Sequence, residues 1–261
     1  MGGFTDSAAV DPEVAALIVV AVSGLMLAGL MVLRGRRGSA PIVRPLTAFK
    51  DLRGEIQGVA ETGGTIHVAV GSGALTGQDT IISLAGLQTL AGVVEAALAY
   101  GVPTLVTVGD PTLFVVCQDV LRRAYERRGL ASLYDPARVR FVVPSRLGYA
   151  AGAAYELSVE GVSVSVMAGA FGAEASLVAD AASRQGIPQL AAAADPLAIG
   201  ALYCATENLA IGEEFFAAGA QTTQSRPQLV SLLVQDVLRV NLVVVTVVAA
   251  VLALLGSLGP R

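Results

Sequence analysis

The sequence is poor in the residues that build metal centres and disulfide frameworks. It holds one histidine, two cysteines and no tryptophan, and a single lysine accompanies sixteen arginines. These numbers are too small for a zinc cluster, a disulfide framework or most non-haem iron sites. The net charge is −4 and no basic stripe is present, so nucleic acid is not an expected partner. Charged residues make up 15% of the chain, against about 25% in an ordinary soluble domain.

Two long apolar segments account for much of this low charge. Residues Val14–Leu33 and Val240–Leu258 contain no charged side chain. A helix of about 20 apolar residues spans a hydrocarbon core of roughly 30 Å, so both segments are predicted to cross a membrane. Acidic residues precede the first segment and arginines follow it, while Arg239 precedes the second. The positive-inside rule then places the intervening domain in the cytoplasm and both termini outside the cell membrane. A cleaved signal peptide is the alternative for the first segment.

The predicted membrane helices divide the chain into successive parts. They are an extracytoplasmic tail (1–13), transmembrane helix 1 (14–33), a basic linker with an amphipathic helix from Thr47 to Glu61 (34–64), a cytoplasmic α/β domain (65–226), a juxtamembrane helix (227–239), transmembrane helix 2 (240–258) and a C-terminal tail (259–261). The lipid bilayer is therefore the first expected partner.

Strands and helices are predicted to alternate through the cytoplasmic domain. The strands are predicted at 66–70, 102–108, 139–143, 162–167, 187–192 and 209–211, with a helix between each pair. Apolar runs of this kind are typical of strands that are covered on both faces. The sequence therefore predicts a doubly wound α/β fold with a mostly parallel, Rossmann-like sheet.

One eleven-residue run occurs twice in the domain. Gly101–Pro111 aligns without gaps to Gly186–Pro196, and five of the eleven positions are identical. Each copy follows a predicted strand and helix, which favours an internal duplication of a β-α-β unit. The alternative is a common local pattern, because glycine ends helices and Asp-Pro begins them.

Residues that follow the predicted strands are candidates for ligand binding, because ligands bind beyond the carboxyl ends of the strands in an open parallel sheet. The candidate residues are Gly71, Ser72, Gly73, Asp110, Arg146 and Asp195. The glycine-rich run that ends at Gly77 resembles a dinucleotide-binding fingerprint, although its third glycine comes one residue late. A tight strand-to-helix turn without any ligand would need the same glycines.

The charged candidates have two explanations each. Asp110 and Asp195 would bind a cation or perform acid–base chemistry, or they would cap the helices that follow them. Arg146 would bind an anion or pair with one of these two aspartates. The single histidine, His67, lies inside a predicted strand, so a Ser-His-Asp triad is not expected. No catalytic residue, metal site or cofactor is assigned.

Four segments of the domain resemble a family of bacterial membrane proteins known as a domain of unknown function. They are Val106–Leu113 (VTVGDPTL), Gln118–Gly129 (QDVLRRAYERRG), Pro144–Ala153 (PSRLGYAAGA) and Ile211–Ala220 (IGEEFFAAGA). The resemblance implies a cytoplasmic α/β domain with flanking membrane helices. It implies no activity, cofactor or catalytic residue.

The leading hypothesis is a non-enzymatic, membrane-anchored module that forms a homo-oligomer or binds membrane-protein partners. Exposed apolar surface is expected in Ala191–Ala194 and in Phe215–Ala218. One alternative is a nucleotide or small-anion sensor at the glycine-rich strand ends. Another is a hydrolase or transferase that uses Asp110 and Asp195.

Overall fold

The structure, a computed structural model, describes residues 46–223 and the isolated positions 22, 24–26, 29, 229, 232, 239, 242 and 243. The chain divides into two units, one of residues Arg44–Ser225 and one of the end segments Met1–Val43 and Arg226–Arg261. Apart from the isolated positions, the tails, both predicted transmembrane helices and the juxtamembrane helix lie outside the described residues. The α/β unit is therefore the part whose contacts are known.

Six parallel strands form one sheet in the order β3-β2-β1-β4-β5-β6. The strands are β1 (Thr65–Gly71), β2 (Thr104–Val108), β3 (Val139–Phe141), β4 (Val162–Ala170), β5 (Gln189–Ala193) and β6 (Leu209–Ile211). Every residue of β1, β2 and β5 is buried, as the apolar runs in the sequence predict. The predicted Rossmann-like parallel sheet is confirmed, and its strand order is that of the dinucleotide-binding fold.

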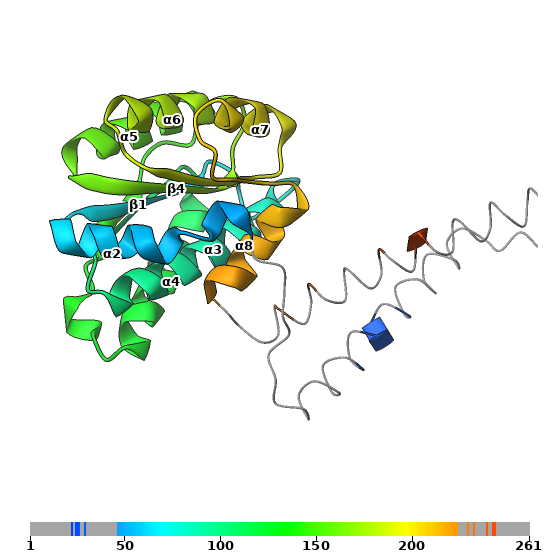
Figure 1. Cartoon of the computed structure of the whole chain (residues 1–261), viewed down its shortest axis with the longest axis horizontal. Coiled ribbons are helices and arrows are strands. Elements are labelled where there is room, and N and C mark those ends of the chain that lie inside the picture. The colour runs from blue at the N-terminus through cyan, green and yellow to red at the C-terminus, as the bar shows by residue number, and fades with distance from the viewer. Residues whose placement is uncertain are drawn as a thin grey trace, which may run out of the picture. The chain divides into compact units, whose positions relative to one another are not determined.

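Helices cover both faces of the sheet, which makes the fold doubly wound (Figure 1). One face is covered by η1 (Thr47–Phe49), α2 (Leu52–Thr62), α3 (Thr80–Ala99), α4 (Pro111–Arg127) and α8 (Glu213–Thr223). The other face is covered by α5 (Arg146–Val159), α6 (Ala175–Arg184) and α7 (Pro196–Tyr203). Two short 3-10 turns, η2 (Ala131–Leu133) and η3 (Pro136–Arg138), connect α4 to β3. Each face therefore has its own apolar core.

Tertiary contacts shift some of the predicted boundaries. The helix predicted from Thr47 to Glu61 is divided into η1 and α2, and the side chains of Leu52, Ile56 and Val59 are buried in the core under α2. Strand β4 continues past the predicted residue 167 to Ala170, and α7 ends at Tyr203 instead of near residue 207. These differences lie at element ends, where local sequence pattern is weakest.

Among the described residues, α3 is the one helix with the length and composition to span a membrane, with a mean hydropathy of 1.7. It packs against β1, β4, α4 and α8, and 61% of its most apolar 18-residue stretch is buried. The apolar side chains of α3 are therefore largely accounted for by packing in the core of the α/β unit.

Candidate functional site

The strand order creates a switch point between β1 and β4, the two central strands. The chain leaves β1 toward β2 and β3, and it leaves β4 toward β5 and β6. Ligands of open α/β sheets bind in the crevice at such a point, beyond the carboxyl ends of the strands. The loop 72–79 after β1 and the loop 171–174 after β4 border this region. Of the predicted residues, Gly71, Ser72 and Gly73 lie here.

These glycines are required by the close approach of the two strand ends. Gly71 has a positive φ of 89°, and a Cβ atom on it would lie 2.4 Å from the carbonyl oxygen of Ala170. A Cβ atom on Gly73 would lie 2.3 Å from the Cβ of Ala170. The amide of Ser72 donates a hydrogen bond to the Ala170 carbonyl over 3.2 Å. Packing alone therefore accounts for glycine at positions 71 and 73.

The geometry after this turn departs from a dinucleotide site. In the fingerprint, the helix begins within the glycine run, so that its free amides face the pyrophosphate. Here α3 begins only at Thr80, whose hydroxyl donates to the carbonyl of Gly77 over 2.9 Å. The intervening loop packs on α3 itself, because the hydroxyl of Ser83 donates to the carbonyl of Ala74.

Three charged groups surround the switch point. Arg146 begins α5, and its guanidinium lies 4.0 Å from the carboxylate of Asp79. Among the described residues Arg146 forms its ion pair with Asp79, and not with Asp110 or Asp195, the pairing that the sequence left open. Glu174, at the start of α6, is buried and accepts a hydrogen bond from the Gly172 amide at 2.8 Å. Asp79 and Glu174 precede α3 and α6, and neither carboxylate accepts a hydrogen bond from the first amides of its helix. Their negative charges disfavour a phosphate beside these helix starts.

Asp110 and Asp195 cap the helices that follow them. Asp110 accepts hydrogen bonds from the amides of Thr112 and Leu113, both at 2.9 Å, and from the Thr112 hydroxyl. Asp195 accepts from the amides of Leu197 at 2.8 Å and Ala198 at 3.3 Å. The repeated runs thus occupy equivalent places in the two halves of the sheet.

These two aspartates do not form one site. Their strands, β2 and β5, are separated by β1 and β4. Three strand spacings of about 4.8 Å place the two capping positions roughly 14 Å apart, too far to share one cation. No group of three His, Cys, Asp or Glu side chains suited to a metal occurs among the described residues.

A buried polar network under α5 was not predicted from the sequence. The ring of His67 is hydrogen-bonded to the hydroxyls of Ser165 at 3.2 Å and Thr107 at 2.9 Å. Thr107 is in turn bonded to the hydroxyl of Tyr149, which accepts a hydrogen bond from the Gly71 amide. Burial lowers the pKa of His67 to about 3 and raises the pKa of Tyr149 above its usual range. The available signal was the presence of polar residues within three otherwise apolar strands.

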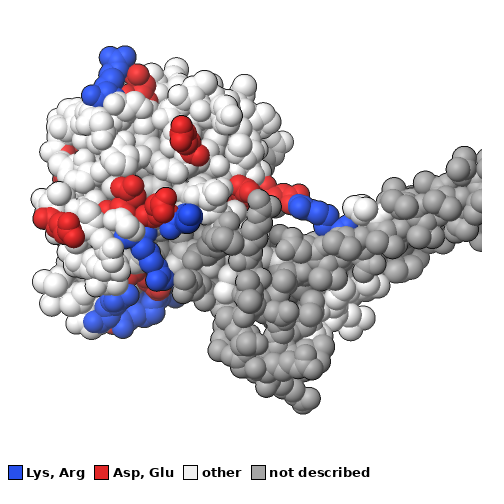
Figure 2. Space-filling model, in the orientation of Figure 1, with Lys and Arg blue, Asp and Glu red and all other residues white. Residues whose placement is uncertain are grey.

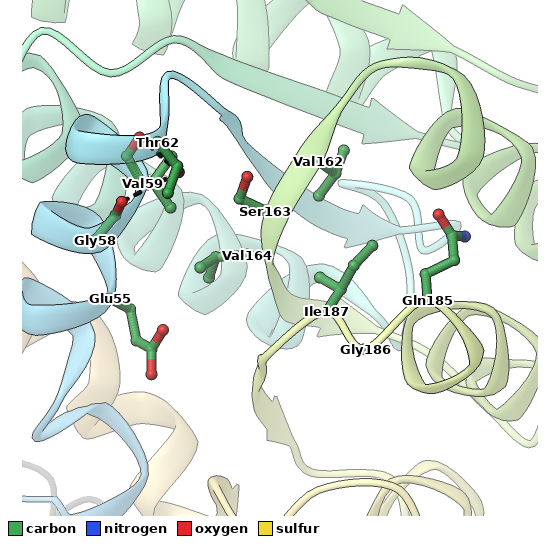
Figure 3. A pocket seen from close by; sticks show the side chains of 10 residues that line it. All are labelled: Glu55, Gly58, Val59, Thr62, Val162, Ser163, Val164, Gln185, Gly186 and Ile187. Carbon is green, nitrogen blue, oxygen red and sulfur yellow. Dashed lines mark hydrogen bonds between the residues drawn. The ribbon is translucent and has the colours of Figure 1, made fainter.

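A separate hollow of about 420 Å³ lies at the opposite edge of the sheet, at the amino end of β4 (Figure 3). It is bordered by α2 and by the turn between α6 and β5. Its lining is Glu55, Gly58, Val59, Thr62, Val162, Ser163, Val164, Gln185, Gly186 and Ile187. None of the predicted site residues belongs to this lining, and Glu55 is its single charged side chain.

Exposed apolar side chains gather on the helices of the second face. On α5, Leu147 and Tyr155 are 68% and 65% exposed, and on α7 Leu197 and Tyr203 are 65% and 73% exposed. In Figure 2, charged side chains are sparse over the α5–α7 part of the visible surface and gather in the lower part. The exposed surface of α5 and α7 therefore carries several large apolar side chains.

The segments expected to provide exposed apolar surface are instead mostly buried, with Ala194, Phe216 and Ala217 half-buried. Ala191, Ala192 and Ala193 form the interior of β5. Phe215 and Ala218 are buried on the inner face of α8. The prediction was wrong because short apolar runs look alike in sequence whether they face the core or solvent. Of the two cysteines, Cys117 is buried and Cys204 is exposed.

Comparison with known proteins places the chain in a family. No curated protein matches it, and no solved structure does either. A family model described as a domain of unknown function (DUF6754) matches residues 6–259, nearly the whole chain. The expected resemblance to an uncharacterised domain family is confirmed over residues 6–259. The chain belongs to the family of domain of unknown function DUF6754.

Proposed function

We propose that this chain is a membrane-anchored α/β module on the cytoplasmic side of the cell membrane, which catalyses no reaction and assembles with itself or with other membrane proteins. The observation that carries the proposal is the exposure of large apolar side chains on α5 and α7, among them Leu147, Tyr155 and Tyr203. Contiguous apolar surface on a folded domain marks sites of association.

The chemistry at the carboxyl edge of the sheet supports a role without catalysis. The carboxylates of Asp110 and Asp195 accept hydrogen bonds from the first amides of the helices that follow them. Arg146 faces Asp79, and Glu174 is bonded to the backbone of its own loop. A general acid or base needs a pKa near the working pH and access to substrate. A carboxylate that caps a helix is instead bonded to backbone amides.

Membrane anchoring is supported by the two apolar segments and by the few described positions within them. Val22 and Leu25 are helical and 54% and 74% exposed. Leu242 and Val243 are helical and 70% and 55% exposed. Helices that expose apolar side chains in this way fit a lipid environment. The arginines that follow the first segment and precede the second favour a cytoplasmic α/β unit.

A second candidate function is the binding of a nucleotide or another small anion at the switch point. It is favoured by the strand order and by the 59% exposed guanidinium of Arg146 beside the strand ends. It is disfavoured by the carboxylates of Asp79 and Glu174 at the neighbouring helix starts. An Asp-dependent hydrolase or transferase is a weaker alternative, because Asp110 and Asp195 follow β2 and β5, which are separated by β1 and β4.

Native mass spectrometry of the full chain, released from detergent micelles, tests the proposal. We expect a defined oligomer, or a stoichiometric complex with a co-purified membrane protein, that carries no nucleotide. A chain that is always monomeric and without a protein partner would contradict the proposal. A bound nucleotide mass that disappears in Arg146→Gln would favour the second candidate, and this exposed substitution leaves the strand ends intact where Gly71→Ala would not.

A further inference from the structure

The outer face of α5 carries one continuous apolar ridge. Leu147, Ala151, Tyr155 and Val159 follow one another at intervals of four residues, and all four are exposed. Residues four apart in a helix lie one above the other, so these side chains form a single row. The inner face of the same helix is buried against the sheet through Tyr149, Ala150, Ala153 and Leu157. Both faces of α5 are therefore apolar, whereas a helix with one buried face carries polar residues on the other.

The charged side chains of α5 add to its helix dipole and do not compensate it. Arg146 lies in the first turn, where the helix end is already positive, and Glu156 and Glu160 lie near the negative end. Glu160 is paired with Arg140 at 2.8 Å, but the carboxylate nearest to Arg146 is 4.0 Å away. Within residues 46–223, Glu156 takes part in no ion pair. Each end of α5 therefore keeps charge that the fold itself offsets only in part.

We propose that α5 is a homodimer interface, across which the α5 helix of a second copy packs antiparallel with the two Ala151 residues at the crossing. This inference rests on the proposed assembly function and names the partner and the surface. The antiparallel arrangement places the positive end of each helix beside the negative end of the other, which supplies the missing charge complement. It also places Leu147 of one copy beside Tyr155 of the other.

A second copy fits this ridge because the ridge is symmetric about its centre. A large side chain lies four residues before Ala151 and another lies four residues after it. A twofold contact requires such a surface, since the same patch must match itself. The alanine at the centre lets the two helices approach closely. Anchoring of both copies in one membrane raises their effective concentration, so that a contact of modest size suffices.

Cysteine cross-linking in membranes tests the position of the contact. The full chain is used with the exposed Cys204 replaced by serine, while Cys117 is buried and stays. We expect Ala151→Cys to form a cross-linked dimer with a short bis-maleimide. Ala60→Cys is the matched control, because Ala60 is also an exposed helical alanine but lies on α2, on the other face of the sheet. An Ala151→Cys chain that yields no more dimer than the Ala60→Cys chain would overturn the inference.

A charge at the same position tests the energetics of the contact. Ala151→Glu brings two like charges together at the crossing and should weaken dimerisation at least tenfold by native mass spectrometry. Ala60→Glu should leave dimerisation unchanged, and both variants should stay folded, since both sites are exposed on the surface of the α/β unit. A dimer that survives Ala151→Glu would overturn the α5 interface while the proposed assembly stands. Cross-linking of Ala151→Cys to a different protein would also overturn the second-copy inference, and a chain without any partner would overturn both proposals.

Discussion

The backbone amide of Gly71, at the end of β1, donates a hydrogen bond to the hydroxyl oxygen of Tyr149 on α5, 3.1 Å away. The same hydroxyl is bonded to the side chain and to the carbonyl of Thr107 on β2. One phenol thus ties two strand ends to the helix above them. This contact joins the ends of β1 and β2 to α5, which has consequences for stability.

Removal of that hydroxyl should destabilise the α/β unit. Tyr149→Phe leaves the buried Gly71 amide without this acceptor and the Thr107 hydroxyl with one partner fewer, a loss of about 1–3 kcal/mol. Tyr155→Phe is the matched control, because Tyr155 is 65% exposed on the same helix and should change stability by less than about 0.5 kcal/mol. Denaturant unfolding of the full chain in detergent measures both. Equal values for the two variants would contradict the assigned role of Tyr149.

Stability should fall as the pH is lowered from 7 to 5, because of His67. An unfolded histidine binds a proton near pH 6.5, whereas burial lowers the pKa of folded His67 to about 3. The stabilisation is therefore present above pH 6.5 and is lost progressively below it, by about 2 kcal/mol at pH 5. Urea titrations at several pH values measure this slope. His67 is the one histidine in the chain, so His67→Gln should remove most of the slope, and an unchanged slope would show that another group causes it.

The two capping aspartates should tolerate asparagine and not alanine. Asp110→Ala and Asp195→Ala should each cost about 1 kcal/mol, while the Asn variants should be nearly neutral, because asparagine caps helices as well as aspartate does. The costs should add in the double variant, since the sites are roughly 14 Å apart. Thermal unfolding of the four single variants and the double alanine variant measures this. A large loss in the asparagine variants would instead indicate that the charges themselves matter.

Two glycine-to-alanine substitutions should have opposite effects. A Cβ atom on Gly169 would lie 1.9 Å from the carbonyl oxygen of Val70, so Gly169→Ala must push β4 away from β1 at a cost of roughly 1–3 kcal/mol or more. Gly200 lies inside α7, and no described residue lies within 4 Å of its Cβ position, so Gly200→Ala should stabilise by about 0.5–1 kcal/mol. Melting temperatures of both variants, measured side by side, check the signs. A neutral Gly169→Ala would mean that the strand ends are less tightly joined than described.

The two cysteines should differ in reactivity. Cys204 is exposed at the end of α7 and should react with a maleimide within minutes in the native chain. Cys117 is buried in α4, where burial raises the pKa of its thiol to about 12, so it should react only on unfolding. Mass spectrometry counts the labels with and without denaturant. Rapid double labelling of the native protein would contradict the burial of Cys117.

Much of the fold could be predicted from the sequence, because the patterns that indicate strands, helix ends and caps are local. Apolar runs predicted the strands, and Gly101 and Gly186 predicted the helix ends, where both have positive φ angles in the structure. The Asp-Pro pairs predicted caps, and Asp110 and Asp195 are caps. In each case the residues that interact lie within a few positions of one another, so the pattern and the contact coincide.

The candidate site was decided by pairings that no local pattern reveals. Strand order alone places β1 beside β4, and with it Gly71 against Ala170 and Arg146 near Asp79. It likewise assembles His67, Thr107 and Ser165, each from a different strand, into one buried network. The packing of α5 on the sheet likewise decides which side of this helix faces solvent.

The sequence by itself thus determined the strands, the helices, their caps and the two long apolar segments. Tertiary structure decided which strands are neighbours, why the glycines at the switch point are glycines, and that Ala191–Ala194 is largely buried while Leu147 and Tyr155 are exposed. The physical reason is that helix and strand formation depends on hydrogen bonds and side-chain periodicity over a few residues. Burial and site geometry depend on contacts between segments far apart in the chain, which form only when the whole sheet is assembled.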